Sequence, residues 1–85
     1  MKLRQIASNM TELSFDEGTR ILFSYQTPVA GRHSDTFFKT ATKYSRTTSR
    51  HIKKYFSDEF DWDSDSVVEY RQESIDSILN DKITL

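Results

Sequence analysis

The residues between positions 43 and 51 are the densest group in the chain that could bind a ligand, because basic and hydroxyl side chains alternate there. Hydroxyl groups donate hydrogen bonds, and arginine guanidinium groups match phosphate oxygens in pairs, so this mixture is typical of an anion site. A simpler role also fits, since Ser45 or Thr47 can cap a helix that begins here. The candidate residues for binding an anion or a partner are Lys43, Ser45, Arg46, Thr47, Thr48 and Arg50.

A helix is expected to carry this group. Residues that suit a core recur at the helical spacing i, i+4, i+7 and i+8, at Thr48, Ile52, Tyr55 and Phe56. This spacing predicts a helix over residues 46–56 whose basic residues face water. A nucleic-acid backbone could bind to the same basic face, with Tyr44 or Phe38 stacking on bases. The isoelectric point of about 6.1 is low for a dedicated nucleic-acid-binding protein.

Charge divides sharply along the chain. Residues 1–56 contain ten basic and four acidic residues, a net charge of +6, whereas residues 57–85 contain two basic and nine acidic residues, a net charge of −7. Such a division indicates either a charged partner or two halves that neutralise each other. We expect the basic helix and the acidic segment 57–65 to approach each other, within one protomer or between protomers.

Patterns that support catalysis or metal binding are missing from the sequence. Neither His33 nor His51 has an acidic or histidine partner one helical turn away. Asp61, Asp63 and Asp65 alternate as in a calcium loop, but the glycine and the final glutamate of an EF-hand are absent. Phosphate-binding glycine loops and nucleophile elbows are also absent. We therefore expect a protein that is not an enzyme and that has neither a cofactor nor a metal.

Composition narrows the class of protein further. The chain of 85 residues has no cysteine, which excludes disulfide frameworks and cysteine-ligated zinc modules. Its longest run without a charge, residues 21–31, is too short to span a membrane, and the first residues do not resemble a secretory signal. These features predict a soluble cytoplasmic protein that does not bind membranes. Apolar residues other than aromatics are few, so a homo-oligomer remains an alternative to a monomer.

The first half of the sequence predicts strands. Polar and apolar residues alternate over residues 11–15 and 19–25, and the turn between them contains Gly18. Further strands are expected over residues 36–40 and, less regularly, over 2–7 and 27–30, with a turn at 31–35. We predict an α+β fold in which an antiparallel meander of three to four strands has one face covered by one or two helices.

The second half is less regular. Residues 57–66 are acidic and lack helical periodicity, so they predict a loop, while residues 67–71 suit either a strand or a helix. The whole chain is expected to form one domain, with a β-rich part at 1–44, the helix 46–56, the acidic loop 57–66 and a C-terminal helix at about 72–80. The predicted core consists of Leu13, Phe15, Ile21, Phe23, Val29, Phe38, Ile52, Tyr55, Phe56, Ile75 and Leu79.

Three segments of the sequence carry a resemblance to a known group of proteins. They are residues 21–30 with Ser-Tyr-Gln-Thr-Pro-Val-Ala, residues 38–40, and residues 44–52 with Ser-Arg-Thr-Thr-Ser-Arg-His-Ile. Together they resemble a family of short uncharacterised proteins of tailed bacteriophages and related viruses, over roughly residues 5–56. The resemblance implies a viral or phage-derived origin. We expect a small non-enzymatic binding protein of viral type that acts on a host or viral macromolecule, and the alternative is a nucleic-acid-binding module that uses the basic face of helix 46–56. That family has no established activity, so it supplies no catalytic residues.

Overall fold

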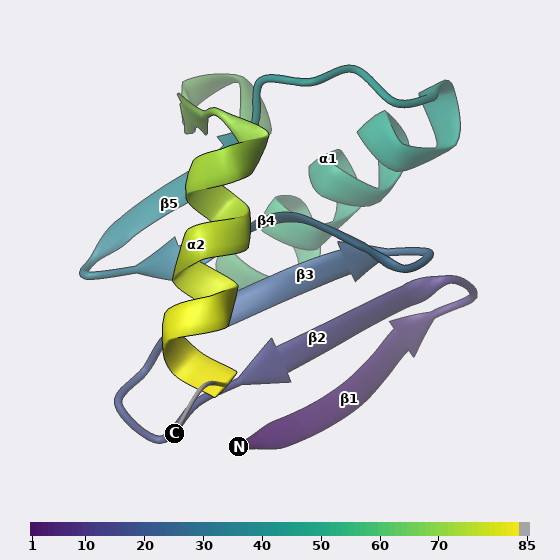
Figure 1. Cartoon of the computed structure of the whole chain (residues 1–85). Coiled ribbons are helices and arrows are strands. Elements are labelled where there is room, and N and C mark those ends of the chain that lie inside the picture. Colours follow the sequence, from purple (N-terminus) through teal and green to yellow (C-terminus); the bar gives the residue numbers. More distant parts are fainter. Residues whose placement is uncertain (84–85) are drawn as a thin grey trace.

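The computed structural model describes residues 1–83. Alternating polar and apolar residues produce five antiparallel strands in the first half of the chain (Figure 1). They are β1 (Lys2–Ala7), β2 (Met10–Ser14), β3 (Arg20–Ser24), β4 (Thr27–His33) and β5 (Thr36–Thr40). The second half contains α1 (Arg46–Phe60), a 3-10 turn at Ser64–Ser66, β6 (Val68–Tyr70) and α2 (Gln72–Ile83). The fold is therefore α+β as predicted, but its sheet has six strands rather than three or four.

The strands lie in the order of the sequence, from β1 at one edge to β6 at the other. The first five strands pair antiparallel, whereas β6 pairs parallel to β5 after the chain has passed through α1. A bulge interrupts the pairing of β1 with β2 between Gln5 and Ala7. Residues 67–71, for which strand and helix were both open, thus contribute a short edge strand.

The turn between β4 and β5 is shorter than the sequence suggested. We expected a turn over residues 31–35, but β4 continues through His33 and only Ser34 and Asp35 form the turn. Both residues have positive φ, 50° and 62°, which is the requirement of a two-residue type I′ hairpin turn. Gly18, in the β2–β3 turn, has a φ of 105° as its predicted position required.

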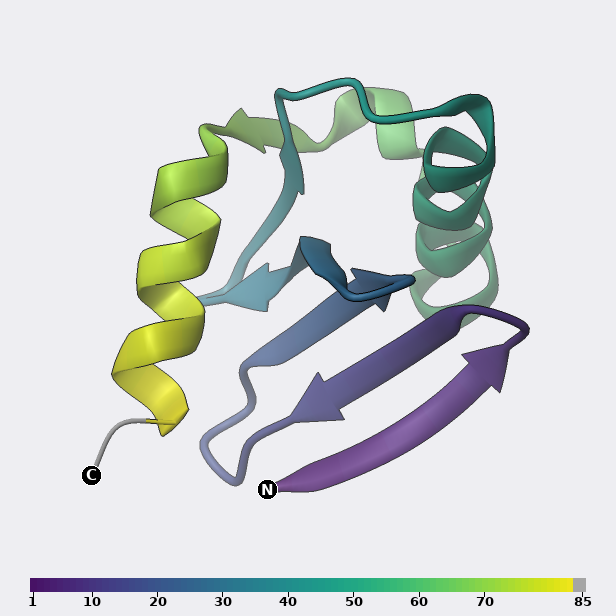
Figure 2. The same ribbon diagram turned by 45° about the vertical axis from the view of Figure 1, so that its right-hand side comes forward.

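The two helices cover opposite faces of the sheet, so the expectation of one covered face is wrong. Figure 2 shows α1 on the right and α2 on the left with the sheet between them. The reason lies in β3, where Ile21 and Leu22 are adjacent in sequence, point to opposite faces, and are both fully buried. Leu22 packs with Ile52, Tyr55 and Phe56 of α1, and Ile21 packs with Ile75 of α2.

Most of the predicted core is buried. The buried members are Ile21, Val29, Phe38, Ile52, Tyr55, Phe56 and Ile75. The other predicted members, Leu13, Phe15, Phe23 and Leu79, are only partly buried. The prediction missed four buried residues, Met10, Leu22, Ala30 and Val67, which all pack in the cluster beneath α1. A sheet with only one covered face would not bury these four residues together with Ile21, Phe38 and Ile75, which pack beneath α2 on the other face.

Helix α1 extends farther than residues 46–56, and the predicted acidic loop is correspondingly shorter. The helix continues to Phe60 because this residue extends the buried stripe of Ile52 and Phe56 by another turn. Asp61 ends it in the left-handed conformation, with a φ of 50°. Over residues 1–83, neither helix has the length and apolar composition that a membrane span requires.

Candidate functional site

The predicted binding residues separate into an exposed group and a buried group. Lys43, Arg46 and Arg50 are exposed and, with the side chains of Tyr44, Ser45 and Ser49, line a shallow groove of about 520 Å³. Thr48 is 6% exposed and points into the fold, and Thr47 is half-buried and outside this groove. The structure thus brings together Lys43, Ser45, Arg46 and Arg50, and separates them from Thr47 and Thr48.

Ser45 caps the helix, and Thr47 does not. The Ser45 backbone is extended, and its Oγ accepts a hydrogen bond of 3.1 Å from the backbone N–H of Thr48. This arrangement satisfies one of the amide groups that every helix leaves unpaired in its first turn. The sequence had left Ser45 and Thr47 as equal candidates for the cap.

A chain of hydrogen bonds, which we call the hydroxyl chain, connects this cap to a histidine. Ser45 Oγ lies 3.2 Å from Thr48 Oγ1, which lies 3.0 Å from Ser24 Oγ, which in turn lies 2.7 Å from His51 Nδ1. We predicted neither Ser24 nor the contact of His51 with the site, because Ser24 comes from β3 and reaches α1 only in the folded sheet. Leu22 and Ser24 share the face toward α1, which is the pattern that could have indicated the contact.

The neutral form of His51 is favoured. Burial and then the charge of Arg50 hold the pKa of His51 below its ordinary value. A neutral imidazole accepts a hydrogen bond at one nitrogen, so Nδ1 can accept from the Ser24 hydroxyl. Ser24 is 2% exposed, which places its hydroxyl beyond the reach of a substrate and makes the pair unsuitable as a nucleophile and base.

Some cations of the described residues pair with carboxylates, and others, among them Lys2, Lys39 and Arg71, do not. Arg4, Arg20, Arg32 and Lys82 each pair with a carboxylate. Within residues 1–83, no carboxylate forms an ion pair with the side chains that we call the basic surface, Lys43, Arg46, Arg50 and Lys53. The basic surface therefore consists of cations that form no ion pair within residues 1–83, although Lys43 and Lys53 share a groove with Asp65 and Glu69.

Of the two aromatic residues proposed for base stacking, only one is accessible. Tyr44 is 46% exposed and borders the groove next to Arg46. Phe38 is fully buried and stacks on Tyr70 at 5.2 Å on the α2 side of the sheet. The suggestion that Phe38 could stack on a base is therefore wrong.

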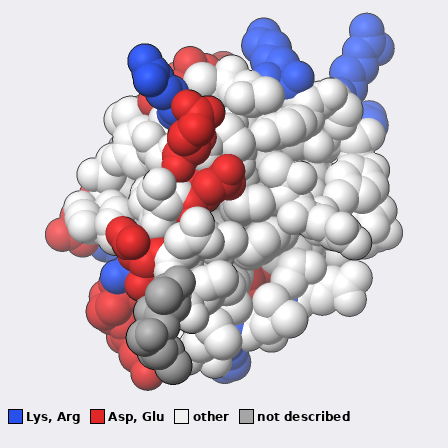
Figure 3. All heavy atoms as spheres, in the orientation of Figure 1, with Lys and Arg blue, Asp and Glu red and all other residues white. Residues whose placement is uncertain are grey.

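The acidic segment approaches the basic helix within one chain, as expected. The 3-10 turn packs against α1, and Lys39 Nζ of β5 holds this turn by donating to the carbonyl oxygen of Ser64 at 2.8 Å. Asp58, also in the acidic segment, belongs to α1 itself and pairs with Lys54 one turn earlier at 2.7 Å. Lys53 and Asp65 line a second, smaller groove between α1 and the 3-10 turn. The acidic residues Glu73, Asp76 and Asp81 lie instead on exposed positions of α2. In Figure 3 acidic atoms gather over α2, and basic side chains project along the upper edge.

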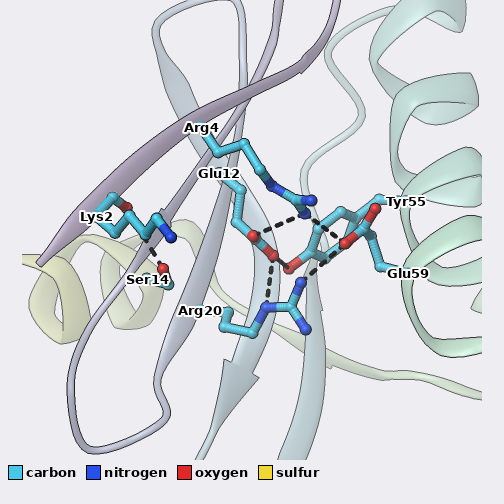
Figure 4. A network of polar contacts seen from close by, with 7 residues as sticks. All are labelled: Lys2, Arg4, Glu12, Ser14, Arg20, Tyr55 and Glu59. Carbon is cyan, nitrogen blue, oxygen red and sulfur yellow. Dashed lines mark hydrogen bonds and ion pairs between the residues drawn. The ribbon is translucent and has the colours of Figure 1, made fainter.

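A separate ionic network joins α1 to the first three strands (Figure 4). Glu12, 3% exposed, accepts from Arg4 at 3.1 Å, from Arg20 at 2.7 Å and from the Tyr55 hydroxyl at 2.7 Å. Arg20 also pairs with Glu59 at 2.9 Å, and Arg4 contacts the same carboxylate. We assign this network a structural role, since every partner is provided by the protein itself.

The pKa values in this network follow from its geometry. Burial alone would raise the pKa of Glu12, but the hydrogen bonds from Arg20 and Tyr55 and the two guanidinium charges outweigh it and lower that pKa. Burial and the Glu12 carboxylate raise the pKa of Tyr55, which stays protonated and donates its hydrogen bond. Glu12 is thus a buried carboxylate that remains ionised because its partners are in place.

Replacing Ser45 with alanine is expected to lower the free energy of unfolding by about 1 kcal/mol, because the Thr48 N–H loses its acceptor. Urea unfolding followed by circular dichroism measures this change. Ser49→Ala is the matched control, since Ser49 is exposed on the same turn and does not cap the helix; it should change stability by less than about 0.5 kcal/mol. Equal stability of the two variants would show that the cap contributes nothing.

Fold and site together define a small α+β protein in which a sheet lies between two helices and one helix begins in an exposed basic surface. The chain belongs to a family of unknown function (DUF8033), whose model matches residues 1–77. Neither the curated proteins nor the solved structures contain a significant match.

Proposed function

We propose that this protein is a small non-enzymatic binding protein that acts on a host or viral macromolecule through the basic surface. One observation carries the proposal: four exposed cations lie just before α1 and along it and form no ion pair in residues 1–83, namely Lys43, Arg46, Arg50 and Lys53. A cluster of exposed cations without ion-pair partners attracts a partner of opposite charge and raises its rate of association. The expected partner is therefore polyanionic.

Nucleic acid is the polyanion that the geometry favours. Tyr44 exposes its ring in the same groove as Arg46 and Arg50, and an aromatic ring beside guanidinium groups suits a base next to its phosphate. The acidic residues of α2 lie on the other face of the sheet, so they would repel a polyanion from that side. An acidic protein surface would use the cations but would gain nothing from the tyrosine ring.

The resemblance of residues 5–56 to short bacteriophage proteins supports a viral or phage-derived origin, with the host cytoplasm as the place of action. A non-enzymatic role is supported by the burial of Ser24, since the Ser24–His51 pair is the contact that most resembles a catalytic one. A homo-oligomer is compatible with this proposal, because the basic surface lies on one helix and leaves the other faces free.

Replacing both Arg46 and Arg50 with alanine is expected to weaken binding of a fluorescein-labelled oligothymidylate by about tenfold at low salt. Fluorescence anisotropy measures the affinity. The slope of log affinity against log salt concentration should fall by about 1.4, which corresponds to two lost phosphate contacts. Both residues are exposed, so the fold should remain stable.

Arg71→Ala is the matched control, because Arg71 is also exposed but lies between β6 and α2. This variant should bind oligothymidylate as the wild-type protein does. Polyglutamate of similar charge is the competing probe: preference for oligothymidylate supports nucleic acid, and preference for polyglutamate supports an acidic protein. Failure of the wild-type protein to bind either probe, or equal binding by the Arg46→Ala/Arg50→Ala variant, would refute the proposed use of the basic surface.

A further inference from the structure

We propose that protonation of His51 reverses the direction of the hydroxyl chain and thereby strengthens anion binding at the basic surface. This inference rests on the proposed function and describes the regulation of the same site. It follows from the spacing of four polar groups, Ser45 Oγ, Thr48 Oγ1, Ser24 Oγ and His51 Nδ1, which are separated in turn by 3.2, 3.0 and 2.7 Å.

With neutral His51, the hydroxyl hydrogens can all point in one direction. Ser45 donates to Thr48, Thr48 donates to Ser24, and Ser24 donates to His51 Nδ1. Ser24 and Thr48 are 2% and 6% exposed, so water does not offer them other partners. Each buried hydroxyl donates one bond and accepts one, which satisfies both. In this state the Ser45 hydroxyl hydrogen points into the protein.

With protonated His51, Nδ1 carries a hydrogen and becomes a donor. Ser24 must then accept from His51 and donate to Thr48, and Thr48 must donate to Ser45. Ser45 Oγ has two lone pairs, so it can accept from the Thr48 hydroxyl while it still accepts from the Thr48 N–H. Its own hydrogen turns outward into the groove that Arg46 and Arg50 line. The heavy atoms keep their places, and Ser45 gains the ability to donate to an anion.

The surroundings of His51 fit this role. On α1 itself the nearby charge is Arg50, and from the turn after β3 the ring of Tyr25 lies 5.8 Å away. No carboxylate of residues 1–83 forms an ion pair with His51. Its positive charge would thus add to the basic surface instead of being cancelled, and a bound anion would in turn favour protonation.

The test measures the affinity for labelled oligothymidylate at constant ionic strength. For the wild-type protein the affinity is expected to rise by about fivefold between about pH 7.5 and pH 5, as His51 becomes protonated. His51→Gln keeps a hydrogen-bonding side chain that does not titrate, so its affinity should be constant over this range. His33→Gln is the matched control, because His33 also contacts a hydroxyl, that of Thr19 at 3.1 Å, but lies outside the groove; it should behave as wild type.

Thr48→Val separates the hydroxyl chain from the charge of His51. Valine keeps the shape of threonine and the backbone N–H that Ser45 caps, but it removes the central hydroxyl. His51 still titrates in this variant, yet Ser45 no longer responds to it. The pH dependence should therefore shrink to the part that the charge of His51 contributes directly, and the affinity at high pH should stay near that of the wild type.

Two results would overturn the inference. If Thr48→Val keeps the full pH dependence, the charge of His51 acts directly and the hydroxyl chain transmits nothing. If wild type and His51→Gln bind with the same pH dependence, His51 is not involved, while the proposed function stands. Failure to bind oligothymidylate at every pH contradicts both. Nitrogen chemical shifts of the His51 ring give an independent check, since the neutral ring should carry its hydrogen on Nε2.

Discussion

Replacing Glu12 with glutamine is expected to lower the free energy of unfolding by about 3 kcal/mol. The Glu12 carboxylate is almost fully buried and accepts hydrogen bonds from two arginines and a tyrosine. Glutamine has the same shape but no charge, and its amide nitrogen must face a donor. Removal of one partner from a buried ionic network leaves the others without compensation, which costs several kcal/mol. We take the lower end of that range because Arg4 and Arg20 are partly exposed. Chemical denaturation measures the change.

Two comparisons make the Glu12 result specific. Glu17→Gln removes an exposed carboxylate that also pairs with a cation, Lys82, and should cost less than about 1 kcal/mol. The second comparison is pH. Because the pKa of Glu12 is lower in the folded protein, the unfolded chain binds a proton first as the pH falls, and stability decreases through the acidic range. The free energy of unfolding of the Glu12→Gln variant should therefore fall less over the same pH range. An unchanged acid profile would contradict the ionised state assigned to Glu12.

Replacing Gly31 with alanine is expected to destabilise the protein by at least about 3 kcal/mol. A Cβ atom at Gly31 would overlap the backbone oxygen of Arg20 and would lie 3.0 Å from Ile21 Cα. These atoms belong to the paired strand β3, so they cannot move aside without breaking the sheet. The φ of Gly31, 158°, is also one that other residues rarely adopt.

Gly18→Ala is the matched control for Gly31. Gly18 has a φ of 105°, but the nearest atom to an added Cβ is Arg32 Nη1 at 3.9 Å. The substitution therefore suffers backbone strain without a clash, and it should cost about 1–2 kcal/mol. Thermal unfolding of both variants measures the difference. Similar costs at the two positions would show that the close approach of β3 and β4 does not limit the residue at 31.

The sequence predicted those elements whose signals are local. The spacing of Thr48, Ile52 and Phe56 identified α1, and Gly18 identified a turn. The opposite positions of the two helices were not predictable in this way. The adjacent apolar residues Ile21 and Leu22 fit a strand buried on both sides, but alternation in the neighbouring strands favours one buried face. The parallel pairing of β6 with β5 depends on where α1 leads the chain. A strand of only three residues gives no sequence signal for that path.

The same distinction holds for the candidate site. Residues 43–50 are contiguous, so their composition alone predicted most of the residues that line the groove. The hydroxyl chain joins Ser24 to Thr48 and His51, and the ionic network joins Arg4 and Glu12 to Tyr55. These partners meet only after the register of the sheet and the docking of α1 are fixed. Residues that lie this far apart in the sequence have no characteristic spacing from which their contact could be predicted.

The two edges of the sheet also determine how copies of the protein can associate. An edge strand exposes unpaired backbone groups that another strand can extend into an aggregate. Here β6 has only three residues, and β1 carries Lys2 and Arg4 and is bent by its bulge. Short, charged or bulged edges resist this growth. We therefore expect the protein to avoid fibre formation at high concentration, and any contact between copies to use helix surfaces instead of sheet edges.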